Sequence, residues 1–346
     1  MKGPMMMAEI SSDEPSGMFA ALRNFLRENR SVSIGAALLV VLVLIGALTV
    51  NGFVSVQNAR SILLLAAFLG LAAVGQTVVA MLGGLDLSIP FLIGAANILL
   101  PKLLNVGLPP VLAMLLIVGL GLLVGCINGM CSFRLQGQSL IVSLGVGFAA
   151  VGATEIYVSI GSNLGSTSYA AVPPWLTNMA AFNGKTFGLA IPPVIVIWAL
   201  LSVFIVWVMR ATWFGRGVYA LGGSRTAAAR LQISEFRTWV SVHGISGAMS
   251  ATTGVLLLGF SGGGFVGVGD PYLFSTVAAV VIGGTSLLGG VGGYGATVLG
   301  ALVLTVMTSL LVGLKLDFAA QQAVIGLLIV PMVAIYARVP HIRNQI

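Results

Sequence analysis

Residues 271–314 read PYLFSTVAAVVIGGTSLLGGVGGYGATVLGALVLTVMTSLLVGL, a run of 44 positions without one charged side chain. A helix needs about 20 apolar residues to cross the hydrocarbon core of a bilayer, so this run is too long for a single span. Its middle, from Gly283 to Gly295, holds seven glycines in thirteen positions, and a break in the helix is expected there. The run therefore predicts two membrane-spanning helices joined by a glycine-rich turn.

The same apolar character extends along the whole chain. Hydrophobic residues make up 58% of the 346 positions and charged residues only 7%, whereas an average soluble domain has roughly 25% charged residues. The first apolar run, Val32–Val50, is longer than the core of a signal peptide and is expected to be an uncleaved span. The composition predicts an all-α, polytopic transmembrane bundle of about ten spans, near residues 32–50, 61–82, 88–104, 109–130, 139–160, 189–209, 238–260, 272–289, 293–313 and 318–337.

The positive charges set the orientation. With ten spans and both termini inside, 12 of the 16 Lys and Arg residues lie on the cytoplasmic side and 4 on the outer side. Short cytoplasmic loops carry such an excess, so an N-in/C-in topology is predicted, and the net charge of +7 calls for no nucleic-acid partner. The expected organisation is a cytoplasmic tail over 1–30, a transmembrane domain over 31–338 with a periplasmic loop at 161–188 and a cytoplasmic loop at 210–237, and a cytoplasmic tail over 339–346.

The cytoplasmic loop Arg210–Arg237 is a charged island between apolar runs. Its 28 residues include five arginines. Gly222-Gly223 is expected to break the chain, after which Ser224 or Thr226 caps a short, alanine-rich helix over Thr226–Leu231. A short helix along the inner surface suits docking to a cytoplasmic partner, and the alternative is an ordinary positively charged loop with no partner.

Few ionisable residues lie in or beside the spans. Asp86 falls in a tight inner turn, where Asp86 or Ser88 is expected to cap the next helix, with Pro90 in its first turn. Glu155 is near the outer end of a span, and His243 is expected to be a packed, hydrogen-bonded histidine. No chain of Asp, Glu and His crosses the membrane in the predicted spans, which argues against a proton pump.

Several short strings imitate catalytic or ligand-binding motifs. Gly184-Lys185-Thr186 lacks the glycine that a phosphate-binding loop needs five positions earlier, and two GxGxxG matches lie outside any strand–turn–helix context. Cys126 and Cys131 do not share a helix face, so neither a disulfide nor a metal site is expected from them. We expect no catalytic residue and no metal ligand in this chain.

Four stretches together resemble the ribose-type (monosaccharide) ABC permeases. Two of them, in the right order, carry most of the specificity: Gly75–Val79 leading to Gly83–Ser88 in the second span, and Ala278–Leu287. The others are Ala220–Ser224 with Ala227–Leu231 in the cytoplasmic loop, and Gln321–Gly326 in the last span. The resemblance covers about residues 50–337.

The resemblance implies a function and a set of partners. Such a subunit is an inner (plasma) membrane permease of a bacterial importer, paired with a second permease that is identical or similar to it. It binds a cytoplasmic ATPase subunit and receives a monosaccharide from a periplasmic sugar-binding protein. It would not be an enzyme and would hold no cofactor, because ATP and Mg bind to the partner ATPase. The cytoplasmic loop would supply the ATPase-coupling residues Gly222, Gly223, Ala227, Arg230 and Leu231.

Passage of a sugar requires hydrogen-bonding groups along the route. The candidates are therefore the polar side chains in or beside the predicted spans: Gln76, Asp86, Ser88, Asn97, Gln138, Ser139, Ser143 and Glu155. The sequence does not show which of them face the pathway.

The chain departs from the pattern of the resembled family at four positions. Pro90 stands where glycine is common, Val151 where arginine is frequent, and Leu273 and Ser275 where acidic residues often occur. These differences bear on the substrate and on contacts with the binding protein. Three other readings stay open: a branched-chain amino-acid ABC permease, an ion-coupled secondary transporter, and a membrane scaffold that transports nothing.

Overall fold

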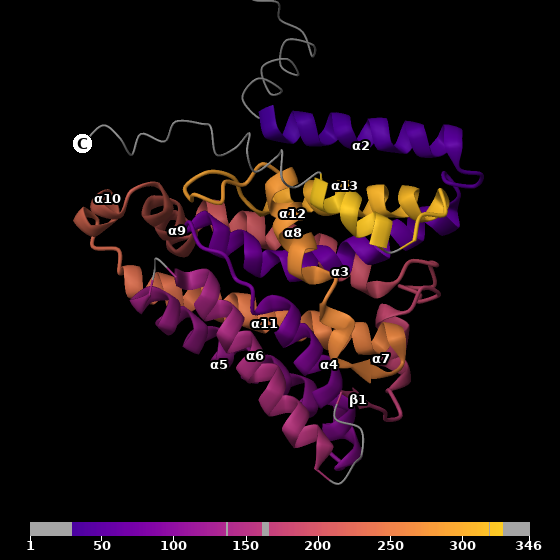
Figure 1. The fold of residues 1–346 in the computed structure, drawn as a ribbon, viewed down its shortest axis with the longest axis horizontal. Helices are drawn as coiled ribbons and strands as arrows, with labels where there is room; N and C mark the ends of the chain where they lie inside the picture. The colour runs from indigo at the N-terminus through magenta and orange to yellow at the C-terminus, as the bar shows by residue number, and fades with distance from the viewer. Residues whose placement is uncertain (1–29, 136–137, 161–165, 318, 328–346) are drawn as a thin grey trace, which may run out of the picture.

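The computed structural model describes residues 30–135, 138–160, 166–317 and 319–327, and most of these are helical (Figure 1). The only strands among them, β1 (Thr167–Ser168) and β2 (Gly264–Phe265), form one short antiparallel pair. The helices are α2 (Arg30–Thr49), α3 (Val56–Met81), α4 (Ile89–Asn105), α5 (Pro110–Arg134), α6 (Ser139–Ser159), α7 (Pro174–Ala180), α8 (Pro193–Ala211), α9 (Trp213–Gly223), α10 (Arg225–Arg230), α11 (Glu235–Ser261), the 3-10 turn η2 (Val266–Gly269), α12 (Tyr272–Ile282) and α13 (Tyr294–Gly313).

The expected all-α polytopic bundle is confirmed, but the number of spans is met only in part. Within the described residues, seven helices are long and apolar enough to cross a membrane: α2, α3, α5, α6, α8, α11 and α13. The predicted third span is α4, with 17 residues. The predicted eighth span, 272–289, is wrong in its length, because α12 ends at Ile282 after 11 residues and the glycine-rich segment that follows is not helical. The predicted tenth span is helical over 319–327, and its remainder lies outside the described residues.

The centre of the bundle is formed by α3 and α11, which are largely buried, whereas few residues of α2, α5, α6 and α8 are buried. The central helix α11 is also the least apolar of the seven, because serine, threonine and histidine replace aliphatic residues on it. Its hydroxyl groups bond to carbonyl oxygens one turn earlier, as Ser250 does to Ser246 and Thr253 to Met249. Polar side chains in a membrane helix face the protein interior, where they find partners.

Small residues bring α5 and α11 into close contact. Gly121, Gly125 and Gly129 form a ridge on α5, and all three are buried. A Cβ atom at Gly125 would overlap the carbonyl oxygen of His243, and one at Gly121 would collide with the backbone at Gly247. Membrane helices gain stability from such close backbone approach, because lipid offers no hydrophobic force to press helices together.

We expect Gly125→Ala to destabilise the protein by about 3 kcal/mol, since the added methyl group must push α5 away from α11. The measurement is the midpoint of thermal unfolding in detergent. Gly119→Ala on the same helix is the matched control, because nothing lies within 4 Å of a Cβ placed there. Equal midpoints for the two variants would show that the α5–α11 contact is not tight.

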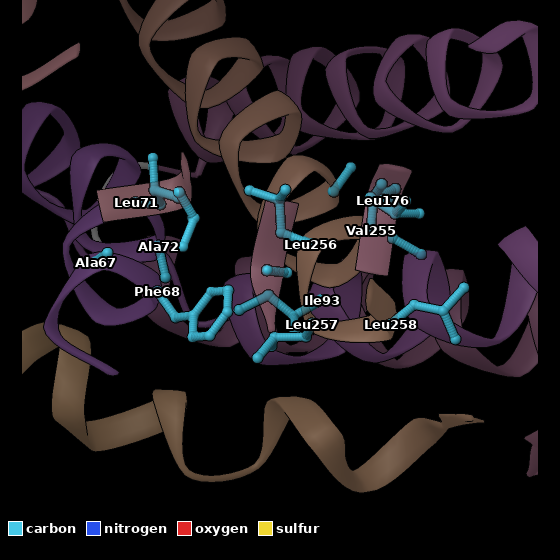
Figure 2. Close-up of a cluster of buried hydrophobic side chains, with 14 of the residues drawn as sticks. Ala67, Phe68, Leu71, Ala72, Ile93, Leu176, Val255, Leu256, Leu257 and Leu258 are labelled. Atoms are coloured by element: carbon cyan, nitrogen blue, oxygen red, sulfur yellow. The ribbon is translucent and has the colours of Figure 1, made fainter. Parts of the chain in front are cut away.

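The main hydrophobic cluster joins six helices, namely α3, α4, α5, α7, α8 and α11. Figure 2 shows Phe68 of α3 next to Ile93 of α4, with Leu256 and Leu257 of α11 beside Ile93, and Leu176 of α7 next to Val255. These side chains are nearly or fully buried. The short helix α7 thereby fastens the described part of the predicted periplasmic loop onto the bundle.

Two segments that are not α-helical, here called the non-helical segments, enter the bundle instead of passing around it; the second includes the 3-10 turn η2. The first, residues 82–88, folds back beside the last turns of α3: Ser246 of α11 lies against Gly75 and also bonds to Asp86. The second, residues 262–271, runs along α4, where the N–H of Phe265 donates to the side chain of Asn97 at 2.9 Å. Irregular backbone at membrane depth is tolerated only where protein buries it or where it lines a water-filled cavity.

The two ends of the bundle differ in character. Figure 1 shows α9 and α10 at one end and α7 with β1 at the opposite end. The first end carries the arginine-containing helices between α8 and α11, and the second carries the described part of the loop that was expected outside. The two loops singled out in the sequence therefore lie at opposite ends of the bundle.

Candidate functional site

The segment between α8 and α11 is two short helices, not an open loop. Thr212 caps α9, its hydroxyl accepting from the N–H of Gly215 at 3.3 Å, and Ser224 caps α10, accepting from the N–H of Ala227 at 3.3 Å. The predicted short helix is present one residue earlier, as α10 (Arg225–Arg230), and Ser224, one of the two expected caps, caps it. Helix α9 was not predicted; it ends at Gly223, so the break expected at Gly222-Gly223 coincides with the boundary between α9 and α10.

Helix α10 is anchored on one side and open on the other. Ala228 is fully buried in a cluster with Val218 and Leu221 of α9 and with the C-terminal end of α3. An ion pair of 3.3 Å joins Arg225 to Glu235 at the start of α11. The anchor holds α10 at a fixed place on the end of the bundle.

The open side of α10 carries three of the five predicted coupling residues. Ala227, Arg230 and Leu231 are exposed, and Leu231 keeps 68% of its surface accessible. Residues three and four apart share a helix face. The exposed apolar side chain of Leu231 lies beside the positive charge of Arg230, on a helix that the buried Ala228 holds in place. Such a surface is suited to contact with a protein partner.

The other two coupling residues are placed differently. Gly223 is exposed, with nothing within 4 Å of a Cβ placed there. Gly222 faces inward, because a Cβ at this position would overlap the carbonyl oxygen of Met81 at the end of α3. Gly222 is thus a packing position between α9 and α3, and no motif in the sequence marks this contact.

A buried polar network surrounds Asp86, which is 2% exposed. Its Oδ1 accepts from the N–H of Ser88 at 2.9 Å, from the hydroxyl of Ser88 at 2.6 Å and from the amide of Asn128 in α5 at 3.1 Å. Its Oδ2 accepts from the hydroxyl of Ser246 in α11 at 2.6 Å. The carboxyl group therefore ties the 82–88 segment to two helices.

The capping prediction for this turn places the N-cap correctly, but the expected side-chain capping bond is not formed. Ser88 occupies the N-cap position of α4 with Pro90 in the first turn, but its side chain makes no capping bond. Asp86 satisfies the N–H of Ser88 instead, an arrangement typical of aspartate two residues earlier. Next to it, the N–H of Leu87 donates to Ser143 of α6 at 3.0 Å.

The remaining candidates for the substrate pathway lie in separate places. Asn97 is buried in α4 and bonds to the carbonyl oxygen of Gly254 at 2.9 Å. Gln138 is exposed and Ser139 half-buried at the start of α6. Glu155 is half-buried at the far end of α6 and accepts from Ser166 at 3.0 Å. Only Asp86, Ser88 and Ser143 are brought together.

Two further buried polar residues are Gln76 of α3 and His243 of α11. Each lies near Ser246, a member of the Asp86 network: Gln76 through its neighbour Gly75, and His243 one helical turn earlier in α11. Gln76 follows Gly75, which lies against Ser246, and the two polar atoms of its amide have no hydrogen-bond partner among the described residues. His243 lies one turn before Ser246 and is held by the carbonyl oxygen of Trp239 at 2.9 Å, as a packed histidine was expected to be. Asn128 and Ser246 were missed, because no motif marks them; their only signal is a polar residue inside an apolar span.

Comparison with known proteins gives a consistent result. Residues 58–333 match the family described as the permease component of branched-chain amino acid transport systems. A probable ABC transporter permease of Escherichia coli (strain K12) is 32% identical over 96% of this chain and 97% of its own. The fructose import permease of Rhizobium meliloti is 30% identical over 91% of this chain and 87% of its own. The ribose import permease of Haemophilus influenzae is 28% identical over 90% of this chain and 93% of its own. No solved structure matches the chain significantly.

Proposed function

The chain belongs to the family of permease components of ABC transporters, and on that premise we propose that it is the membrane-spanning subunit of an ATP-driven importer for a monosaccharide. It is a multi-pass inner-membrane protein, as its family and the seven apolar helices among the described residues show. The observation that carries the proposal is α10, a short helix anchored by Ala228 that presents Arg230 and Leu231 at one end of the bundle.

In this proposal the end with α9 and α10 is cytoplasmic, and a separate ATPase subunit docks on the exposed face of α10. The excess of arginine in this segment supports the orientation. Hydrolysis takes place on the partner, where ATP and Mg bind, and this chain supplies only the moving helices. A second permease subunit, identical or similar, completes the translocation unit, and a periplasmic binding protein delivers the sugar at the opposite end, where α7 lies.

The proposed pathway follows the two non-helical segments that enter the bundle. Transporters place their substrate sites where helices are interrupted, because free backbone groups and helix ends are available there. The Asp86 network lies on one such segment and Asn97 beside the other. The proposal also assigns pathway contacts to four further polar residues, Gln76, Gln138, Ser139 and Glu155.

The monosaccharide is favoured by the relatives, which are named for import of fructose and ribose. A branched-chain amino acid is the second candidate, favoured by the description of the matching family. An ion-coupled carrier or a scaffold has no such support.

A binding panel separates the two substrates. We expect the cognate periplasmic protein to bind one or a few monosaccharides in calorimetry, and to bind leucine, isoleucine and valine far more weakly. The same sugar should be taken up by proteoliposomes that hold the complete transporter. Tight binding of a branched-chain amino acid and no binding of any sugar in the panel would replace the first candidate by the second.

A further inference from the structure

Three segments that are far apart in the sequence meet at the end of the bundle that carries α9 and α10. They are the end of α3, the last turns of α9, and residues 283–293, which join α12 to α13 and are here called the inner loop. The N–H of Gly290 in the inner loop donates to the carbonyl oxygen of Met81 at 3.0 Å. Gly222 of α9 packs directly against the same carbonyl group.

This junction leaves no room for independent movement. A Cβ at Gly222 would overlap the oxygen of Met81 and would lie 2.7 Å from the nitrogen of Gly290. On the loop side, Gly290 has φ +76 and a Cβ there would lie 2.9 Å from the Cα of Gly223. Surfaces packed this closely shift as units and do not deform continuously.

A second contact joins α9 to the inner loop beside the first. The hydroxyl of Tyr219, one turn before Gly222, donates to the carbonyl oxygen of Gly292 at 2.9 Å. Tyr219 is half-buried, and burial raises the pKa of its hydroxyl above the ordinary value of 10.0 although the nearby Arg210 charge acts in the opposite direction. The hydroxyl therefore keeps its proton and remains a donor at neutral pH.

Hydrogen bonds within the inner loop hold its shape, so a displacement of the loop is passed on to the flanking helices α12 and α13. The N–H of Ser286 donates to the carbonyl oxygen of Val291 at 3.0 Å, and the N–H of Gly293 donates to the hydroxyl of Thr285 at 3.1 Å. Where the loop leaves α12, Gly283 packs against the backbone of Ala296 in α13. The loop thus forms a closed bridge between α9 and the α12–α13 pair.

We propose that Tyr219 is a positioning residue that transmits the displacement of α9 and α10 through the inner loop to α12 and α13. This inference rests on the proposed function, in which an ATPase moves α10. It assigns to the glycine-rich segment the role of a mechanical link, and to the Tyr219 hydroxyl the contact that keeps the link engaged.

The test compares Tyr219→Phe with Tyr157→Phe in proteoliposomes that contain the permease, its ATPase and the sugar-loaded binding protein. Tyr157 is the matched control, because it is an exposed tyrosine at the other end of the bundle and the change removes only a hydroxyl group. We expect Tyr219→Phe to retain the ATPase subunit and its hydrolysis rate while sugar uptake per ATP falls about fivefold, the size expected for one lost neutral hydrogen bond. Unchanged uptake per ATP, or loss of the ATPase from the complex, would overturn the proposal.

Hydrogen exchange tests the link without reference to transport. In the full-length protein, we expect Tyr219→Phe to speed amide exchange in 283–293 and in α9, and Tyr157→Phe to leave both unchanged. Unaltered exchange in 283–293 would overturn the role of Tyr219. If exchange responds as expected while the wild-type protein shows no ATP-dependent uptake, the link stands and the proposed function fails.

Discussion

Asp86→Ala is expected to lower the free energy of unfolding by about 4 kcal/mol, because it leaves the buried N–H of Ser88 without an acceptor and the amide of Asn128 with only a 3.4 Å bond to the Ser88 hydroxyl. The hydroxyl groups of Ser88 and Ser246 lose the same acceptor but can rotate towards other oxygens. The measurement is the unfolding midpoint in detergent, together with the yield of protein inserted in the membrane. The effect should be large because one carboxyl group holds the 82–88 segment, α5 and α11 together.

Two further variants make the result specific. Asp270→Ala removes an exposed carboxyl group and should change the midpoint little. Asp86→Asn keeps one acceptor oxygen, and its amide can donate to the hydroxyl of Ser246, so its loss should be less than half that of Asp86→Ala. If Asp86→Ala proved as stable as Asp270→Ala, the network would not hold these elements together.

Arg230→Glu combined with Leu231→Asp is expected to reduce sugar uptake at least about tenfold, which corresponds to the loss of roughly 1.4 kcal/mol or more at a docking contact. The charge reversal and the loss of the apolar tip both fall on the exposed face of α10. Membrane insertion should be unchanged, since neither side chain is buried. Uptake and sugar-stimulated ATP hydrolysis are measured in the same proteoliposomes.

The matched control reverses a charge outside α10. Arg237 is exposed in the first turn of α11, so Arg237→Glu applies the same change to the same end of the bundle and should leave uptake near the wild-type level. Normal uptake and normal stimulation in the double variant would show that the ATPase does not dock on α10. A drop of equal size in Arg237→Glu would indicate a general effect of charge.

The helical bundle could be predicted from composition, because an apolar chain in lipid must satisfy its backbone within helices. The lengths of the helices could not be predicted where a glycine ends a helix early. Helix α12, for example, stops at Ile282 although the apolar run continues. The break expected at Gly222-Gly223 is present, because α9 ends at Gly223 and α10 begins at Arg225, but α9 itself was not predicted. The close packing of Gly222 against Met81 and of Gly290 against Gly223 depends on tertiary contacts that local sequence does not contain.

The candidate site was partly visible in the sequence. The exposed face of α10 followed from a cap, an alanine run and an apolar end, all of which are local signals. The Asp86 network could not be predicted from local signals, because its donors Asn128 and Ser246 lie 42 and 160 residues away in the chain. The same holds for Tyr219, whose partner Gly292 is 73 residues distant.

Uptake of the cognate sugar by the wild-type complex is the most direct test of an ATP-driven permease. Proteoliposomes are prepared with and without the ATPase subunit, each with the sugar-loaded binding protein outside and with ATP and Mg, or ADP and Mg, inside. We expect accumulation of sugar only where the ATPase and ATP are both present. Accumulation without either of them, or accumulation that follows an imposed proton or sodium gradient, would contradict the assignment and would indicate a secondary transporter.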